Sequence, residues 1–165
     1  MEYTFQNGNE IYKRTKLQVG PLYLSSQAYK EQSLNVSRVY TSALPLTSIY
    51  FTSTESVPQE WLENIDGTSN DLSADNFLRY WLIIGGNEYP ITPGNRTGSN
   101  PIKYYINSPL SEDSRSLLKE NENCSFIDIS EGVTTWQLKA MLTRPSNSED
   151  STPVISGYRF IYTYE

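Results

Sequence analysis

The fold is decided near the C-terminus, where residues 133–144 read VTTWQLKAMLTR and residues 152–164 read TPVISGYRFIYTY. In the first segment, apolar side chains occupy every second position: Trp136, Leu138, Ala140 and Leu142. Because successive side chains of a β-strand point to opposite faces, this spacing predicts a half-buried strand.

Aromatic side chains alternate in the same way along the second segment, at Tyr158, Phe160, Tyr162 and Tyr164. The intervening positions include Arg159 and Ile161, so the other face of this strand is also partly apolar. We expect one face to contribute to the core and the other to be available to a partner.

Further segments rich in β-branched and aromatic residues predict strands at 11–19, 21–25, 35–42, 47–54, 77–84, 101–106 and 124–129. Many short strands joined by turns predict an all-β fold, specifically an antiparallel β-sandwich with jelly-roll-like topology. Helix is expected in two places. One is a single turn within residues 58–65, and the other is a short helix at 111–120, capped by Ser111, with Leu117 and Leu118 facing inward.

The domain organisation is predicted to be an N-terminal arm or hairpin, residues 1–19, followed by one β-sandwich domain, residues 20–165. Asn7-Gly8-Asn9 favours a hairpin turn. The arm has few apolar side chains, and a lone two-stranded hairpin is marginally stable, so we expect it to pack mainly against another subunit. Residues 92–100 are predicted to form an exposed loop of the kind that carries contacts.

Composition excludes several classes of function. The formal net charge is −6, which disfavours binding to nucleic acid. There is no apolar run of about 18 residues and the start does not resemble a signal peptide, so no membrane partner or cleaved export signal is expected. Cys124 is the single cysteine, which rules out an intramolecular disulfide.

Enzymatic chemistry is not predicted. The chain has no histidine, which removes the usual general base and zinc ligand. Asp66, Asp71 and Asp75 lie in a loop that could bind Ca²⁺, but the spacing does not match an EF-hand, and an Asx-rich loop is the better interpretation. We therefore predict no catalytic residues, no metal ligands and no cofactor; a histidine-free glycosidase is a weak alternative.

The aromatic residues leave three interpretations open. Tyr80-Trp81, Tyr104-Tyr105 and the tyrosines of residues 158–164 could form a protein interface, a sugar-stacking platform or ordinary core packing. Adjacent residues of a strand point to opposite faces, so half of each pair should be core.

The two segments from Val133 to Tyr164 resemble the closing hairpin of β-sandwich modules in the tail, baseplate and neck proteins of tailed bacteriophages. In those modules an alternating apolar strand ends in a polar loop, and a Thr-Pro step, here Thr152-Pro153, begins a last strand that ends in Tyr. The likeness covers about 30 of the 165 residues and carries over no catalytic residue. Carbohydrate-binding sandwiches also close in this way.

The resemblance implies a non-enzymatic structural component of a tailed-phage virion, in the neck, tail or baseplate or decorating the capsid. Its partners would be other virion structural proteins and copies of itself, and it would be made in the cytoplasm of the bacterial host. The alternative is a carbohydrate-binding module or fibre tip that recognises a surface glycan.

Overall fold

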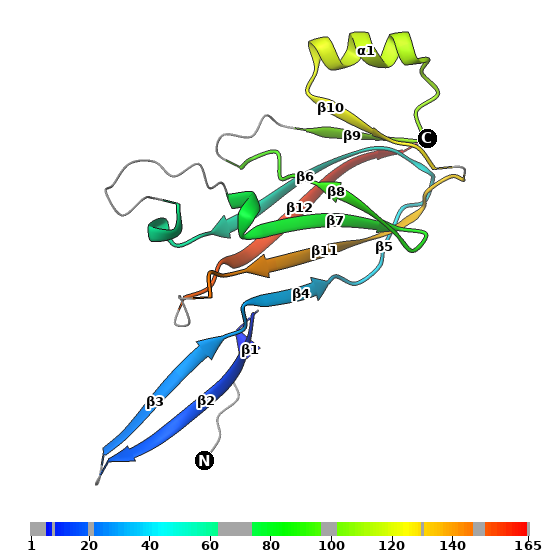
Figure 1. Ribbon diagram of the computed structural model, residues 1–165. Coiled ribbons are helices and arrows are strands. Elements are labelled where there is room, and N and C mark those ends of the chain that lie inside the picture. The colour runs from blue at the N-terminus through cyan, green and yellow to red at the C-terminus, as the bar shows by residue number, and fades with distance from the viewer. Residues whose placement is uncertain are drawn as a thin grey trace. The chain divides into compact units, whose positions relative to one another are not determined.

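The computed structural model describes residues 6–7, 9–19, 22–62, 74–96, 102–129, 131–146 and 151–164, with side chains from Lys30 onward (Figure 1). The chain divides into two compact units, which are described separately. The first comprises Met1–Asn35, Glu55–Arg79 and Ala140–Ile155, and the second comprises Val36–Thr54, Tyr80–Lys139 and Ser156–Glu165.

Strands dominate the described residues, and the prediction of an all-β class is confirmed. The strands are β1 (Gln6–Asn7), β2 (Asn9–Val19), β3 (Leu22–Tyr29), β4 (Gln32–Val36), β5 (Tyr40–Thr41), β6 (Leu46–Ser56), β7 (Leu78–Ile84), β8 (Asn87–Ile91), β9 (Lys103–Ile106), β10 (Cys124–Ile127), β11 (Thr135–Thr143) and β12 (Val154–Tyr164). The helices are the 3₁₀ turns η1 (Gln59–Trp61) and η2 (Ala74–Asn76) and the α-helix α1 (Glu112–Asn121).

The strands form three sheets. Their orders are β1-β2-β3, β10-β9-β6-β12, and β4-β11-β7-β8 with β5 paired to β11. The sheets are mainly antiparallel, as the predicted antiparallel sandwich requires, but β9 and β10 run parallel. Parallel neighbours need a long crossover connection, and α1 lies in that connection.

The N-terminal strands form a long antiparallel hairpin, in which β2 pairs with β3 from Val19↔Leu22 to Ile11↔Tyr29. β1 pairs with β2 through Asn7↔Asn9, on either side of the predicted turn. The predicted domain boundary at residues 19 and 20 falls within the β2–β3 hairpin. That boundary, and the packing of the arm against another subunit, stay predictions.

The core of the second unit follows the alternation predicted from the sequence. Trp136 and Leu138 of β11 are buried, and Gln137 between them is half-buried. Phe51 of β6 is fully buried and meets Tyr80 of β7 edge-on, with ring centroids 4.9 Å apart. Since β6 and β7 belong to different sheets, this aromatic contact joins the two sheets within the unit.

The first unit has its own small core. Trp61 of η1 packs against Phe77 with ring centroids 5.2 Å apart, and both are buried with Ala140 and Leu142 of β11. The backbone carbonyl of Phe77 accepts a hydrogen bond from the amide of Thr143. The predicted helical turn is therefore present as η1, while Ile65 lies outside the described residues.

Helix α1 begins as predicted, because the Ser111 side chain accepts a hydrogen bond from the backbone amide of Ser114. The prediction that Leu117 faces inward is wrong: this residue is 60% exposed, and Leu118 is half-buried. Arg115 and Leu118 share the half-buried side, and successive helix residues are about 100° apart, so Leu117 turns outward.

The exposed loop predicted at residues 92–100 is wrong for its first half, because Pro93, Gly94 and Arg96 are buried. The Asn95 side chain accepts a hydrogen bond from the Ser53 amide at 3.0 Å and donates one to the Ser53 carbonyl at 2.6 Å. It thereby satisfies both backbone groups of one β6 residue, as a neighbouring strand would. Residues 97–101 lie outside the described residues.

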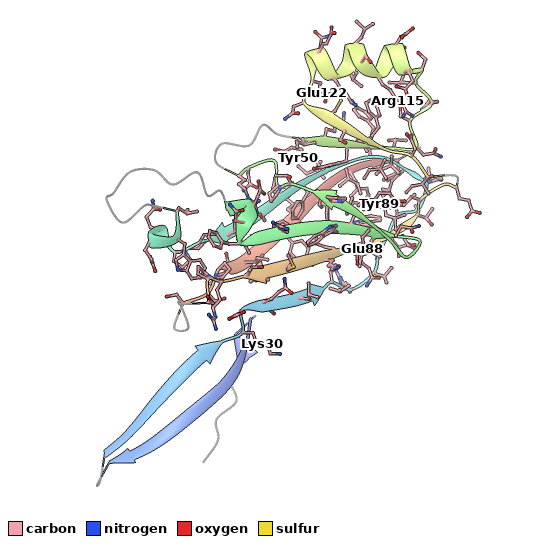
Figure 2. All side chains as sticks on the ribbon, viewed as in Figure 1. Lys30, Tyr50, Glu88, Tyr89, Arg115 and Glu122 are labelled. Atoms are coloured by element: carbon pink, nitrogen blue, oxygen red, sulfur yellow. The ribbon has the colours of Figure 1, made fainter. Side chains whose placement is uncertain are left out.

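Gly94 lies against the ring of Tyr50, and its amide donates to the Phe51 carbonyl. Tyr50, which is labelled in Figure 2, belongs to β6. A Cβ atom at this position would overlap the Tyr50 ring. We therefore expect Gly94→Ala to lower the free energy of unfolding by about 1–2 kcal/mol, as overpacking does. Chemical denaturation measures this loss. In a Tyr50→Ala background the same substitution should cost little, and an equal cost in both backgrounds would contradict the contact. Gly157→Ala, where a Cβ meets nothing, is the matched control.

Candidate functional site

The most exposed apolar strand of the second unit is β12. It ends the order β10-β9-β6-β12, so among the described strands its outer edge has no hydrogen-bonded neighbour. Tyr158, Ile161, Tyr162 and Tyr164 are all substantially exposed, from 38% for Tyr162 to 49% for Tyr164. Exposed apolar side chains on an open sheet edge are typical of a surface that another chain covers.

The inner edge of β12 is held firmly by β6. The Thr163 hydroxyl lies 2.7 Å from the hydroxyls of both Thr47 and Ser48, and the Ser156 hydroxyl donates to the Thr54 carbonyl at 3.2 Å. Because the C-terminal part of β12 meets the start of β6, the two strands run antiparallel. The outer edge has none of the usual protection: Arg159 is the one charged residue of this strand, and it contains no proline.

A cluster of aromatic rings lies beside this edge. Tyr40 of β5 stacks on Trp136 with centroids 5.8 Å apart, and its hydroxyl is 2.6 Å from the Tyr158 hydroxyl. Phe160 meets Tyr40 edge-on at 5.5 Å, and Tyr162 meets Trp136 edge-on at 5.1 Å. The cluster therefore joins β12 to β5 and β11 of the other sheet.

The cluster surrounds a pocket of about 200 Å³. Its lining is Tyr40, Thr41, Trp136, Tyr158, Phe160 and Tyr162. The lining contains no charged side chain. The pocket is thus suited to an apolar group rather than to an ion.

The ring geometry does not favour a flat sugar-binding platform. The planes of Tyr40 and Tyr158 cross at 89°, and those of Tyr158 and Phe160 cross at 67°. Tyr40 and Trp136 are closer to parallel at 27°, but Trp136 is buried and offers no open face. Crossed rings of this kind are typical of packed cores and protein interfaces.

The Trp136 indole N–H is buried and has no hydrogen-bond partner in the described part of the chain. A buried donor left without an acceptor costs about 1–3 kcal/mol. The rings of Tyr40, Phe160 and Tyr162 pack against Trp136, and these aromatic contacts offset the cost.

The Tyr158 hydroxyl is neutral over the physiological range. Burial, and then the hydrogen bond with Tyr40, raise the pKa of Tyr158 to about 12. This hydroxyl therefore remains protonated near neutral pH.

Some charged residues elsewhere in the second unit pair with one another. Arg115 of α1 forms two hydrogen bonds with Asp128, at 2.7 and 2.8 Å (Figure 2), and this pairing lowers the pKa of Asp128. Glu122 accepts a hydrogen bond from Tyr105 and lies 3.8 Å from the Lys103 ammonium. These contacts fix α1 and the β9–β10 pair in place, and we assign them a structural role.

Cys124 is buried in β10, and burial is the main cause that raises its thiol pKa. The thiol is therefore protonated at neutral pH, which is the opposite of what a nucleophile requires.

No cluster of three or more potential metal ligands occurs among the residues that the structure describes. Asp66 and Asp71 lie outside those residues, and Asp75 is exposed in η2. No described helix is both long and apolar enough to cross a membrane.

In each of the other two aromatic pairs, one residue is buried and its neighbour is half-buried, as expected for adjacent residues of a strand. Tyr80 and Tyr104 are buried, while Trp81 and Tyr105 are half-buried on the opposite face. Sequence reasoning missed Tyr40, because nothing in its local pattern indicates that it meets Tyr158, 118 positions away. The β12 residues of the site were indicated by the alternation of aromatic side chains along residues 158–164.

Comparisons with known proteins found no protein-family model, no curated protein and no solved structure that matches this chain.

The Tyr40–Tyr158 contact can be tested with Tyr40→Phe. Loss of this partly exposed hydrogen bond should lower the free energy of unfolding by about 0.5–1 kcal/mol. It should also move the pKa of Tyr158 down from about 12 toward the ordinary value of 10. Ionisation of the unfolded state begins near pH 10, so the contribution of Tyr158 to stability is complete below that pH and is lost as the pH rises toward 12.

Denaturation and absorbance titration of the phenols measure the two effects. Tyr164→Phe is the control, since Tyr164 is exposed and its hydroxyl lies outside the Tyr40–Tyr158 pair. After allowance for the one phenol that Tyr40→Phe removes, an unchanged pKa of Tyr158 would contradict the assignment.

Proposed function

We propose that this protein is a non-enzymatic structural subunit that acts through protein–protein contacts, as a component of a tailed-bacteriophage virion. The observation that carries the proposal is the open outer edge of β12, with its exposed tyrosines and Ile161. A sheet edge that exposes apolar side chains and unpaired backbone groups is suited to another polypeptide chain.

The aromatic pocket supports the same function. A partner chain placed against β12 can insert one apolar side chain into the pocket of about 200 Å³. Contact with the exposed apolar side chains of β12 would provide affinity, and the pocket would provide specificity.

The virion context rests on the resemblance of residues 133–164 to the closing hairpin of phage β-sandwich modules. Those residues include β11 and β12, and the contacts of Trp136 with Phe160 and Tyr162 link the two strands. We propose further that the two larger sheets form a jelly-roll-like sandwich; the Phe51–Tyr80 and Tyr40–Phe160 contacts between the sheets support this architecture. This context includes the neck, the tail, the baseplate and the capsid surface.

Glycan binding is the second candidate, and one observation favours it. The Tyr162 and Tyr164 rings lie 6.1 Å apart with planes 38° from parallel, and both are exposed. Two neighbouring rings can stack on two faces of a saccharide. Binding of the isolated protein to a glycan array, abolished by Tyr164→Ala, would favour this candidate.

The protein-contact function predicts that Ile161→Glu prevents association. A carboxylate on the outer edge of β12 would lose its hydration on association, which is costly unless an opposite charge pairs with it. The variant should therefore remain monomeric at concentrations where the wild type assembles. Sedimentation velocity over a wide range of concentrations measures this difference. Leu34→Glu is the matched control, because Leu34 is an apolar residue of β4 with 58% exposure. Assembly of Ile161→Glu at wild-type strength would contradict the assignment of β12.

A further inference from the structure

A second exposed surface lies on α1. Asp113, Leu117 and Glu120 are spaced four and three residues apart, which places them on one face of the helix. All three are exposed, and Leu117 is among the most exposed apolar residues of the described chain. We call these three residues the helix stripe. The opposite side of α1, with Arg115 and Leu118, is half-buried, and α1 contacts β10.

The helix stripe and the edge of β12 lie at opposite ends of one sheet. The strand order β10-β9-β6-β12 places β10 and its helix at one end and β12 at the other (Figure 1). Both ends belong to the second unit. A contact between the two surfaces would therefore have to join different copies of the chain.

The surface at the β12 end consists of six exposed apolar residues with two arginines. We call it the edge surface, and its members are Val39, Leu44, Tyr158, Ile161, Tyr162 and Tyr164, with Arg38 and Arg159. Tyr40 links residues 38–39 to β12 through its contact with Tyr158, and the Thr47–Thr163 contact brings the end of β12 close to Leu44.

The two surfaces are complementary in charge. The edge surface carries two guanidinium groups, whereas the helix stripe carries the carboxylates of Asp113 and Glu120 around Leu117. Two edge surfaces placed together would oppose arginine to arginine, and two helix stripes would oppose carboxylate to carboxylate. Pairing of unlike surfaces is the arrangement without like-charge repulsion.

The size of the edge surface also suits a protein partner. At roughly 200 Å² for a large apolar side chain, six residues that are about half exposed offer on the order of 500–600 Å². A stable interface takes roughly 800 Å² from each partner, part of it a polar rim. The polar and charged neighbours of the six residues can supply that rim.

We infer that the partner of the edge surface is a second copy of this chain, which binds through its helix stripe. The inference rests on the proposed function and names the partner of that same site. Each copy then uses one surface to bind the copy ahead and the other to bind the copy behind. Such a head-to-tail contact produces a ring when the rotation closes and a filament when it does not.

The test uses two full-length variants that each disable one surface. The edge variant carries Arg159→Glu and Ile161→Glu, and the helix variant carries Leu117→Glu. Glutamate is well tolerated in helices and Leu117 is exposed, so the helix variant should fold. Circular dichroism checks folding, and Leu34→Glu in β4, at an exposed apolar residue that belongs to neither surface, controls for the added negative charge.

Sedimentation velocity should show larger assemblies for the wild type and the control, and monomers for each variant alone. An equimolar mixture of the variants should form a 1:1 dimer and nothing larger. The reason is that the intact helix stripe of the edge variant can bind the intact edge surface of the helix variant.

The remaining outcomes overturn the inference, and they separate it from the proposed function. If the helix variant assembles like the wild type while the edge variant does not, the head-to-tail contact is wrong and β12 still serves a protein interface. If both variants assemble, or if the wild type stays monomeric at all concentrations, the proposed use of β12 in self-association is wrong as well. A mixture that stays monomeric overturns the head-to-tail contact alone.

Discussion

An open β-sheet has two edges, and each exposes backbone groups that must be paired, covered or protected. In the sheet β10-β9-β6-β12 the two edges differ. β10 is short, has a helix beside it, and is followed by Asp128, which binds Arg115. β12 has eleven residues, one charge and exposed apolar side chains on both faces. This asymmetry places the candidate site at the β12 edge rather than at the β10 edge.

The aromatic cluster shows how the edge can be apolar and still well ordered. Tyr40 comes from β5, Trp136 from β11 and Phe160 from β12, so the rings connect strands of two sheets. Edge-to-face contacts of this type add about 0.5–1.5 kcal/mol per pair beyond the burial of area. The cluster fixes the positions of the tyrosines, which lowers the entropy that a partner would have to remove on binding.

The sequence predicted much of the fold, because alternation is a local property. β12 occupies the predicted residues, β11 buries Trp136 and Leu138 as expected, and Ser111 caps α1. The predictions that failed depend on contacts between residues that are far apart in the sequence. Parallel pairing of β9 and β10 depends on a crossover, the orientation of Leu117 depends on which side of α1 faces β10, and the Asn95–Ser53 contact depends on tertiary packing. The meeting of Tyr40 with Tyr158 could not be predicted from either segment alone.

The pairing of β6 with β9 has a mechanical consequence. Its ladder has three residue pairs, from Ser48↔Tyr105 to Tyr50↔Lys103, whereas the contacts between β6 and β12 extend from Thr47 to Thr54. A pulling force applied across the sheet passes through every ladder in series, and each ladder resists in proportion to the hydrogen bonds that share the load. The sheet should therefore part between β6 and β9 first, leaving β12 attached to β6 and the helix attached to β10.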